Sequence, residues 1–183
     1  HNKLPTKFFF INDLDEDHIR KLDKEVALIY RNYSIKLNKE LIVNIKKVCK
    51  KDGRKFFLSN NLKMAINLGL DGAYLPSFNQ IQNINKEHIK KNFIIIGSAH
   101  SVREIRIKER QGVDMIFLAP LFKTPKNKKF LNTIKFNFLS LQTNKKVVAL
   151  GGISSKNVDK LKMVNTYGFA GISYFKNNDT IKI

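Results

Sequence analysis

Short apolar runs alternate with longer amphipathic segments along the whole chain. Several runs, such as "FIII" and "VVAL", lack strict alternation of apolar and polar residues, which is typical of strands buried on both faces. The pattern therefore predicts eight parallel strands. They lie within residues 7–13, 26–32, 55–60, 72–77, 93–101, 113–122, 145–154 and 169–175.

The segments between these runs have the features of helices. In "NKELIVNIKKVCKKDG", Asn38 is a candidate N-cap and Gly53 a candidate stop. Repeated βα units favour parallel strands with right-handed crossovers, and eight units favour a closed (βα)8 TIM barrel formed by residues 1–183 as one domain. An open doubly wound sheet is the alternative. The predicted helices lie within residues 14–25, 38–53, 61–69, 85–92, 102–112, 132–144 and 155–168.

A glycine recurs just before three of the predicted strands, in "LGLDGAYL", "QGVDMIFL" and "YGFAGISY". Gly69, Gly112 and Gly168 are each expected to end a helix in the left-handed conformation. The sequence printed here stops soon after the last apolar run. We therefore expect the eighth helix to be missing or truncated.

The high net charge does not by itself indicate a nucleic-acid-binding protein. The formal net charge is +19, but lysines occur in every segment rather than in one block. Such a surface binds polyanions weakly at low salt, so we expect no specific nucleic-acid partner. No apolar run has the length of a membrane span, and Cys49 is the only cysteine. We expect a cytoplasmic protein, and its oligomeric state is not readable from the sequence.

Polar residues gather where the predicted strands end, which is where barrel enzymes carry their active sites. This set has few carboxylates and several cations, and it therefore suits an anionic ligand. It comprises Asp13, Arg31, Asn32, Asn60, Asn61, Ser77, Asn79, Ser98, His100, Thr124, Gly151, Gly152 and residues 173–176.

Two of these strand ends have the features of a phosphate site. In "FKTPKNKK", Thr124 and turn amides could bind phosphate oxygens beside Lys126 and Lys128. In "ALGGIS", Gly151 and Gly152 allow backbone amides to approach an anion. The alternative is a tight turn with solvated lysines. The two motifs at matching barrel positions favour phosphate.

His100, in "GSAHS", is the only histidine at a predicted strand end. A histidine there could move protons near neutral pH if a partner and a substrate lie within hydrogen-bond reach. The alternative is a histidine that holds the loop through backbone contacts. Both interpretations stay open at this stage.

The motifs "GSAHS", "GVD", "APLFKTP" and "GGI" occur in an order and at a spacing that resemble the thiamine phosphate synthase family, which includes TenI-like thiazole tautomerases. The likeness extends from about residue 56 onward and more loosely before it. It implies a (βα)8 barrel that binds a thiazole phosphate, the expected small-molecule partner. Synthases join this phosphate to an aminopyrimidine methyl diphosphate with the help of Mg²⁺.

The resemblance also implies roles for individual residues. Arg31 matches the arginine of a second-strand motif, and Ser98 and His100 would lie by the reacting rings. The phosphate of the thiazole would be held by Gly151, Gly152, Phe175 and Lys176, and the phosphate or diphosphate would face Thr124, Lys126 and Lys128.

Two departures from the family concern Mg²⁺. Asn60-Asn61 replaces the family's Asn-Asp after the third strand, and Asn79 replaces the second magnesium-binding aspartate. Because Mg²⁺ prefers charged carboxylate oxygens, these changes disfavour a metal site and an efficient synthase. We expect no cofactor and a tautomerase-type proton transfer by His100. The alternatives are a synthase that uses Mg²⁺, with Asp13 drawn in, and an inactive phosphate-binding barrel.

Overall fold

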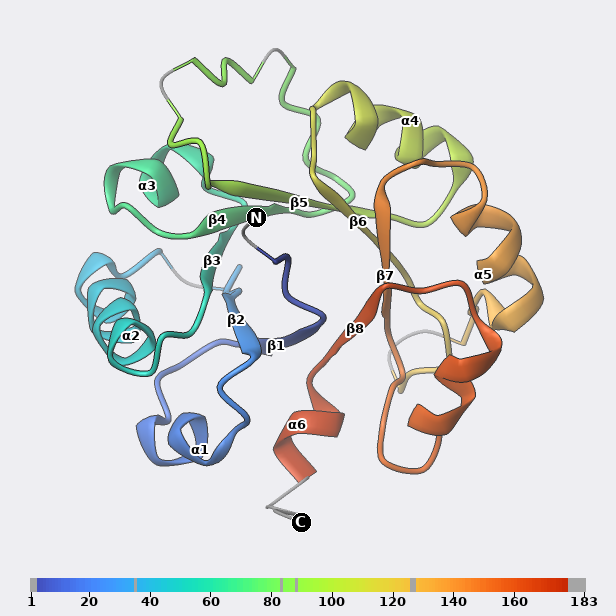
Figure 1. The fold of residues 1–183 in the computed structure, drawn as a ribbon, viewed down its shortest axis with the longest axis horizontal. Coiled ribbons are helices and arrows are strands. Elements are labelled where there is room, and N and C mark those ends of the chain that lie inside the picture. The colour runs from blue at the N-terminus through green and yellow to red at the C-terminus, as the bar shows by residue number, and fades with distance from the viewer. Residues whose placement is uncertain (1–2, 35, 83, 88, 126–127, 178–183) are drawn as a thin grey trace.

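A computed structural model describes residues 3–34, 36–82, 84–87, 89–125 and 128–177. Eight parallel strands pair in sequence order, and the last strand pairs with the first, so the sheet closes into a barrel (Figure 1). The predicted fold class is confirmed. The strands are β1 (Lys7–Ile11), β2 (Val26–Tyr30), β3 (Phe56–Ser59), β4 (Gly72–Leu75), β5 (Ile94–Ala99), β6 (Met115–Leu118), β7 (Lys146–Leu150) and β8 (Gly168–Gly171).

Side chains of each strand alternate between the barrel interior and the layer beneath the helices. In β1, Phe8 and Phe10 belong to the interior cluster, whereas Phe9 packs in the outer layer. Aromatic rings fill much of the interior, and the Phe8 and Phe117 ring centroids lie 4.9 Å apart in an edge-to-face arrangement. Burial on both faces explains why the strands lack a polar side.

The helices surround the barrel (Figure 1). Asn38 caps α2 as predicted, because its side chain accepts a hydrogen bond from the Leu41 amide, and Gly53 follows with a φ of 67°. The helices of the described residues are α1 (Glu16–Lys21), α2 (Lys39–Lys51), α3 (Leu62–Asn67), α4 (Val102–Arg110), α5 (Asn132–Ser140), the 3₁₀ helix η1 (Val158–Met163) and α6 (Ser173–Asn177).

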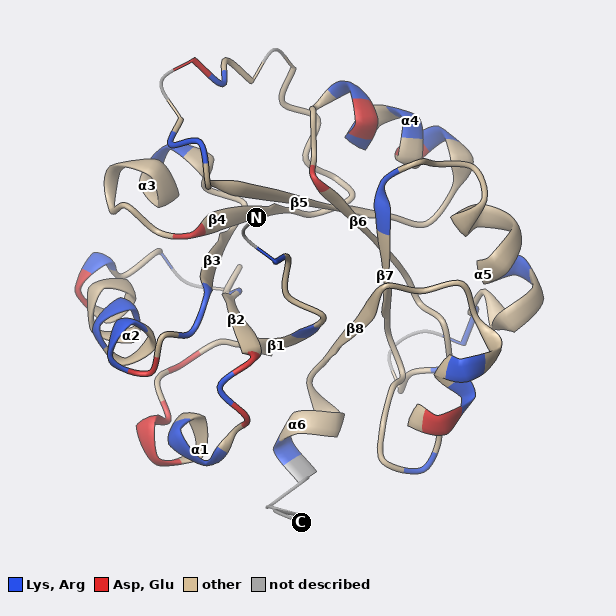
Figure 2. Cartoon of the chain, viewed as in Figure 1, with Lys and Arg blue, Asp and Glu red and all other residues tan. Residues whose placement is uncertain are grey.

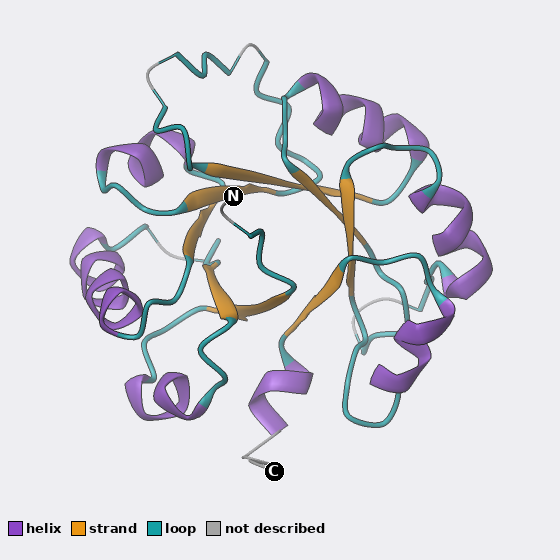
Figure 3. Ribbon diagram, viewed as in Figure 1, coloured by secondary structure: helices purple, strands orange, loops and turns teal. Residues whose placement is uncertain are grey.

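The connection between β4 and β5 differs from the prediction. The expected helix at 85–92 is wrong, because the described residues of this connection form turns and irregular backbone (Figure 3). Lys108 of α4 donates to the Pro76 carbonyl at 2.7 Å, and Gln111, which directly follows α4, donates to the Ile81 carbonyl at 2.9 Å. These tertiary hydrogen bonds replace those that a helix would provide. The helix expected at 155–168 is likewise shorter, and it is the single 3₁₀ segment η1.

The last apolar run, residues 169–175, forms the end of β8 and the start of α6, whereas a single strand was predicted. The backbone leaves the sheet after Gly171, and α6 follows, so the strand predicted over 169–175 ends early. Phe175 of α6 packs against Phe9 and Phe169, with ring centroids 5.5 and 5.6 Å away. This short helix therefore covers the outer side of β1 and β8, where an eighth helix was expected to be missing or truncated. Residues 178–183 lie outside the described residues.

The three glycines of the repeat do not behave alike. Gly69 and Gly112 have φ values of 59° and 70°, as predicted for helix-ending residues. Gly168 instead begins β8, where a Cβ atom would lie 2.0 Å from the Thr6 carbonyl oxygen. It is required for close packing of two backbones, and the expectation of a left-handed helix end is wrong there.

Lysine and arginine residues are distributed over the helices and loops, while the strands contain few charged residues (Figure 2). The distribution agrees with the scattered lysines of the sequence. Within the described parts of the chain, no helix combines the length and apolarity needed to cross a membrane.

Candidate functional site

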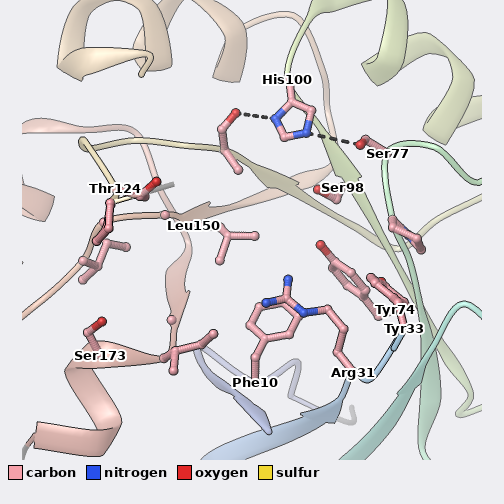
Figure 4. A pocket seen from close by; sticks show the side chains of 18 of the residues that line it. Phe10, Arg31, Tyr33, Tyr74, Ser77, Ser98, His100, Thr124, Leu150 and Ser173 are labelled. Carbon is pink, nitrogen blue, oxygen red and sulfur yellow. Dashed lines mark hydrogen bonds between the residues drawn. The ribbon is translucent and has the colours of Figure 1, made fainter. Parts of the chain in front are cut away.

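A cavity of about 550 Å³ opens at the carboxyl ends of the strands (Figure 4). No carboxylate side chain occurs among its described lining residues. The polar lining comes from Arg31, Ser77, Ser98, His100, Thr124 and Ser173, the aromatic lining from Phe10, Tyr33, Tyr74 and Phe78, and the glycine lining from Gly151, Gly152 and Gly171. The strand ends thus bring Arg31, Ser98, His100, Thr124 and the glycine pair together, as the sequence predicts.

His100 follows β5 and is held from two directions. Its Nδ1 lies 2.6 Å from the Ala119 carbonyl oxygen, and its Nε2 lies 3.2 Å from the Ser77 hydroxyl (Figure 4). Because a carbonyl only accepts, Nδ1 carries the proton, and Nε2 of the neutral ring is left as a base. The backbone amide of His100 donates to Glu104 at 2.6 Å, which fixes the start of this loop.

The pocket floor is aromatic and carries one cation. The Arg31 guanidinium lies 4.4 Å from the centroid of the Phe10 ring, in cation–π geometry. Tyr74 is buried beside Ser98, and burial raises the pKa of Tyr74 to about 12, although a hydrogen bond from Ser98 opposes the shift. Tyr74 therefore stays neutral at physiological pH, while Arg31 supplies permanent positive charge.

Two exposed aromatic residues stand at the mouth of the pocket. The Tyr33 and Phe78 rings meet edge to face with centroids 5.6 Å apart, and the Tyr33 hydroxyl bonds to Ser59 at 2.7 Å. Neither residue was predicted from the sequence as a site residue. Both residues lie just after a strand end, which was the available signal. They were not predicted because the candidates at the strand ends are polar, charged and glycine residues.

The glycine pair is required by close backbone packing. Gly151 and Gly152 have φ values of 99° and 70°. A Cβ atom on Gly151 would lie 2.7 Å from Pro120 Cα, and one on Gly152 would lie 2.6 Å from the Lys123 carbonyl oxygen. The loops after β6 and β7 therefore meet at this side of the pocket, and neither position tolerates a side chain in this arrangement.

Comparison with known proteins agrees with this architecture. The family model described as thiamine monophosphate synthase matches residues 18–175. The chain therefore belongs to the thiamine monophosphate synthase family, and so to thiamine biosynthesis. It is 29% identical over 191 residues to the thiamine-phosphate synthase of Pelagibacter ubique, which covers 97% of this chain and 88% of that protein.

Other relatives give the same result. The thiamine-phosphate synthase of Clostridium tetani is 26% identical over 159 residues, with coverage of 86% of this chain and 76% of that protein. The solved thiamine phosphate pyrophosphorylase of Pyrococcus furiosus superposes with a TM-score of 0.71 at 20% identity, covering 92% of this chain and 86% of that one. At this identity the superposition shows a shared fold.

Some residues that the family resemblance singled out lie away from the pocket. Lys128 is exposed and does not line it, and Phe175 is buried in the outer core. Lys176 and Asp13 line a separate cleft beside α1. Lys126 lies outside the described residues. The structure thus brings the glycine pair and Thr124 to the pocket, whereas the described Lys128 and Lys176 lie outside its lining.

The residues at the family's magnesium positions do not fit a Mg²⁺ ion. Asn61 accepts the Met64 amide as the N-cap of α3, and Asn60 accepts from Asn79 at 2.8 Å. The Asn79 side-chain oxygen accepts the Ile81 amide at 3.1 Å. All three amide oxygens are therefore engaged and uncharged. The described residues also contain no cluster of three histidine, cysteine or acidic side chains able to hold a metal.

Proposed function

We propose that this member of the thiamine monophosphate synthase family binds a thiazole phosphate and catalyses a tautomerase-type proton transfer without Mg²⁺. The observation that carries the proposal is a pocket that contains Arg31 and His100 and has no carboxylate in its described lining. Such a lining favours an anionic ligand, because no negative charge opposes it and Arg31 attracts it.

The phosphate is proposed to bind on the side formed by the glycine pair, Thr124 and Ser173. Thr124 and Ser173 lie across the pocket from Tyr33 (Figure 4). Backbone segments with little side-chain bulk, such as Gly151 and Gly152, allow an anion to come close to amide groups. The thiazole ring would then extend towards His100 and the aromatic residues at the mouth.

His100 is proposed as the acid and base. Nε2 of the neutral ring removes a proton from one ring atom of the substrate, and the resulting imidazolium returns a proton to a second atom. The bond from Nδ1 to the Ala119 carbonyl holds the ring and stabilises its charged form. The Ser77 hydroxyl donates to Nε2 in the resting state and is displaced by the substrate.

A synthase reaction is the second candidate, and the names of the relatives favour it. It would join the thiazole phosphate to an aminopyrimidine methyl diphosphate and release diphosphate. The engaged amide oxygens of Asn60, Asn61 and Asn79 argue against metal-assisted departure of that group. Asp13, the remaining carboxylate considered for this role, faces a different cleft.

The decisive experiment follows hydrogen exchange and isomerisation of a thiazole phosphate by proton NMR in deuterated buffer. We expect turnover without Mg²⁺ and a loss of about 10²- to 10⁴-fold in the His100→Gln variant. Ser173→Ala should weaken binding with a smaller effect on turnover.

Two other results would replace the proposal. Product formation that needs both the pyrimidine diphosphate and Mg²⁺ would establish the synthase. Binding without turnover under either condition, unchanged in His100→Gln, would establish an inactive phosphate-binding barrel.

A further inference from the structure

Lys108 of α4 is a lysine placed inside the protein. It is 0% exposed, and it occupies the inward face of the helix one turn after the buried Ile105. Its alkyl chain crosses β5 at Gly97, where a Cβ atom would lie 2.8 Å from Lys108 Cδ. A glycine in the strand therefore makes room for a long cationic side chain.

The ammonium group lies beneath the loop that follows β4. It donates to the backbone oxygens of Pro76 and Asn79 at 2.7 and 2.8 Å, and to Gln111 Oε1 at 3.0 Å. These partners are neutral. Burial lowers the pKa of Lys108 to about 8, while the charge of Glu104 acts in the opposite direction. The group is therefore still mainly protonated at pH 7, and it carries a positive charge into the interior.

Gln111 extends this arrangement. Its amide nitrogen donates to the Asn79 side chain at 3.2 Å and to the Ile81 carbonyl at 2.9 Å. Asn79 in turn donates to Asn60 at 2.8 Å, which joins the loop after β4 to the loop after β3. Lys108 and Gln111 thus hold both ends of residues 76–81 from below.

The two residues between the carbonyls that Lys108 binds are Ser77 and Phe78, and both line the pocket. Ser77 contacts Nε2 of His100, and Phe78 contacts Tyr33 at the mouth. Any movement of this short loop therefore moves the partner of the proposed base and one wall of the ligand site.

We propose that the buried ammonium of Lys108 is the cation that orders the loop after β4, so that Ser77 and Phe78 are positioned without a divalent metal. The same loop carries Asn79 at a position where the family resemblance implies a magnesium-binding aspartate. A fixed positive charge beneath that loop repels a metal ion, and neutral amides do not offset the repulsion. Lys108 is a positioning residue, because it acts through the loop and does not line the pocket.

The test compares the full chain with Lys108→Met and with Lys46→Met as a matched control. Lys46 donates to the Leu68 carbonyl at 2.7 Å, so the control removes a similar bond on another helix. Amide exchange of residues 77–81 and the NMR shifts of the His100 ring are measured with and without ~5 mM Mg²⁺, a concentration that fills weak sites. Neither readout needs a ligand.

We expect amide exchange of residues 77–81 to quicken roughly tenfold or more in Lys108→Met, with altered His100 ring shifts, and no such change in Lys46→Met. Mg²⁺ should leave the wild-type protein unchanged. Unaltered exchange in Lys108→Met, or a loop that Mg²⁺ protects further in the wild type, would overturn the proposal.

A second variant and a binding measurement complete the test. If circular dichroism shows that Lys108→Met is unfolded, Lys108→Gln is used, and failure of both to fold would assign Lys108 to the core and overturn the proposal. Thiazole phosphate affinity should fall roughly tenfold in Lys108→Met. This arm alone rests on the proposed function, so absence of binding in the wild type would count against that function and leave the exchange result intact.

Discussion

Two buried cations, Arg54 and Lys108, bind backbone oxygens at opposite ends of the barrel. Arg54 is 3% exposed, and its guanidinium donates to backbone oxygens of Asp23 and Val26 at 2.7 and 2.6 Å. It thereby joins the segment after α1 to the start of β2. Lys108 is equally buried and also binds backbone oxygens, but those oxygens belong to a loop of the pocket.

The difference lies in what each cation holds. In barrels of this kind the amino ends of the strands contribute to stability and the carboxyl ends carry the site. Arg54 binds four backbone oxygens at the amino end, including those of Ile19 and Leu22 at 3.1 and 3.3 Å. Lys108 binds two backbone oxygens, those of Pro76 and Asn79, at the carboxyl end. We therefore expect Arg54 to affect folding and Lys108 to affect the site.

The largest expected effect is on stability, in Arg54→Met. The substitution leaves several buried carbonyl groups with fewer donors, and it should lower the free energy of unfolding by about 3 kcal/mol. Urea unfolding measures the change. The folded fraction should bind ligand with unchanged affinity. A loss of less than about 1 kcal/mol would show that the guanidinium bonds are replaced by water.

Gly152 at the carboxyl end of the barrel and Gly53 at the amino end are expected to differ in the same way, with smaller effects on stability. Gly152→Ala places a Cβ atom 2.6 Å from the Lys123 carbonyl oxygen at a φ of 70°, and it should cost about 2 kcal/mol and weaken phosphate binding. Gly53→Ala is the control at the amino end, because it has a similar φ of 67° and nothing within 4 Å. It should cost about 1 kcal/mol. Equal losses in the two variants would mean that the packing at Gly152 is unimportant.

Lys108→Met is expected to change the free energy of unfolding at pH 7 by less than about 1 kcal/mol, because replacing a buried charge by an apolar side chain of similar length is often neutral. Thermal and urea unfolding would measure it. A loss as large as that of Arg54→Met would remove the distinction between the two cations.

The pH dependence of stability should differ between the wild type and Lys108→Met. The folded-state pKa of Lys108 is about 8, against 10.5 in the unfolded chain, so between these values the unfolded chain binds more protons. Lys108 therefore makes the wild type gain stability relative to the variant as pH rises from 8 to 10.5. Below pH 8 the difference in the free energy of unfolding between the wild type and Lys108→Met should not change with pH.

The comparison with the variant is needed because other groups titrate in the same range. Burial raises the pKa values of Cys49 and Tyr74 to about 12, which lowers stability as pH rises through their unfolded values. These contributions are the same in both proteins and cancel in the difference. A difference that falls between pH 8 and 10.5 would contradict the burial of a charged Lys108.

Most of the barrel was predictable because its strands are short, apolar and separated by clear helix signals. The Asn38 cap and the stop at Gly53 are local, so the sequence alone determines them. The connection after β4 was not predictable, since its conformation depends on hydrogen bonds from a helix about 30 residues away. The end of β8 was missed for a related reason, because Phe175 turns outward to fill space beside Phe9.

The site was predictable where a polar residue directly follows a strand. His100 and Arg31 reach the pocket in this way, and Ser98 reaches it from near the end of β5. Lysine positions were less predictable. Lys128 lies in a loop, where a long flexible side chain has no fixed direction, and Lys176 belongs to α6, whose start was predicted as part of the last strand, and lines another cleft. Lys108 did leave a signal, namely a lysine on the apolar face of an amphipathic helix three residues after Ile105.

The pocket is proposed to bind a thiazole phosphate without a metal ion. Calorimetric titration of the full chain with thiazole phosphate at ~150 mM salt, with and without Mg²⁺, tests for this binding most directly, because this salt suppresses nonspecific attraction to the basic surface. We predict saturable binding at one site with an affinity that Mg²⁺ does not change. Absence of binding in both conditions, or binding only when Mg²⁺ is present, would show that the pocket is not a metal-independent phosphate site.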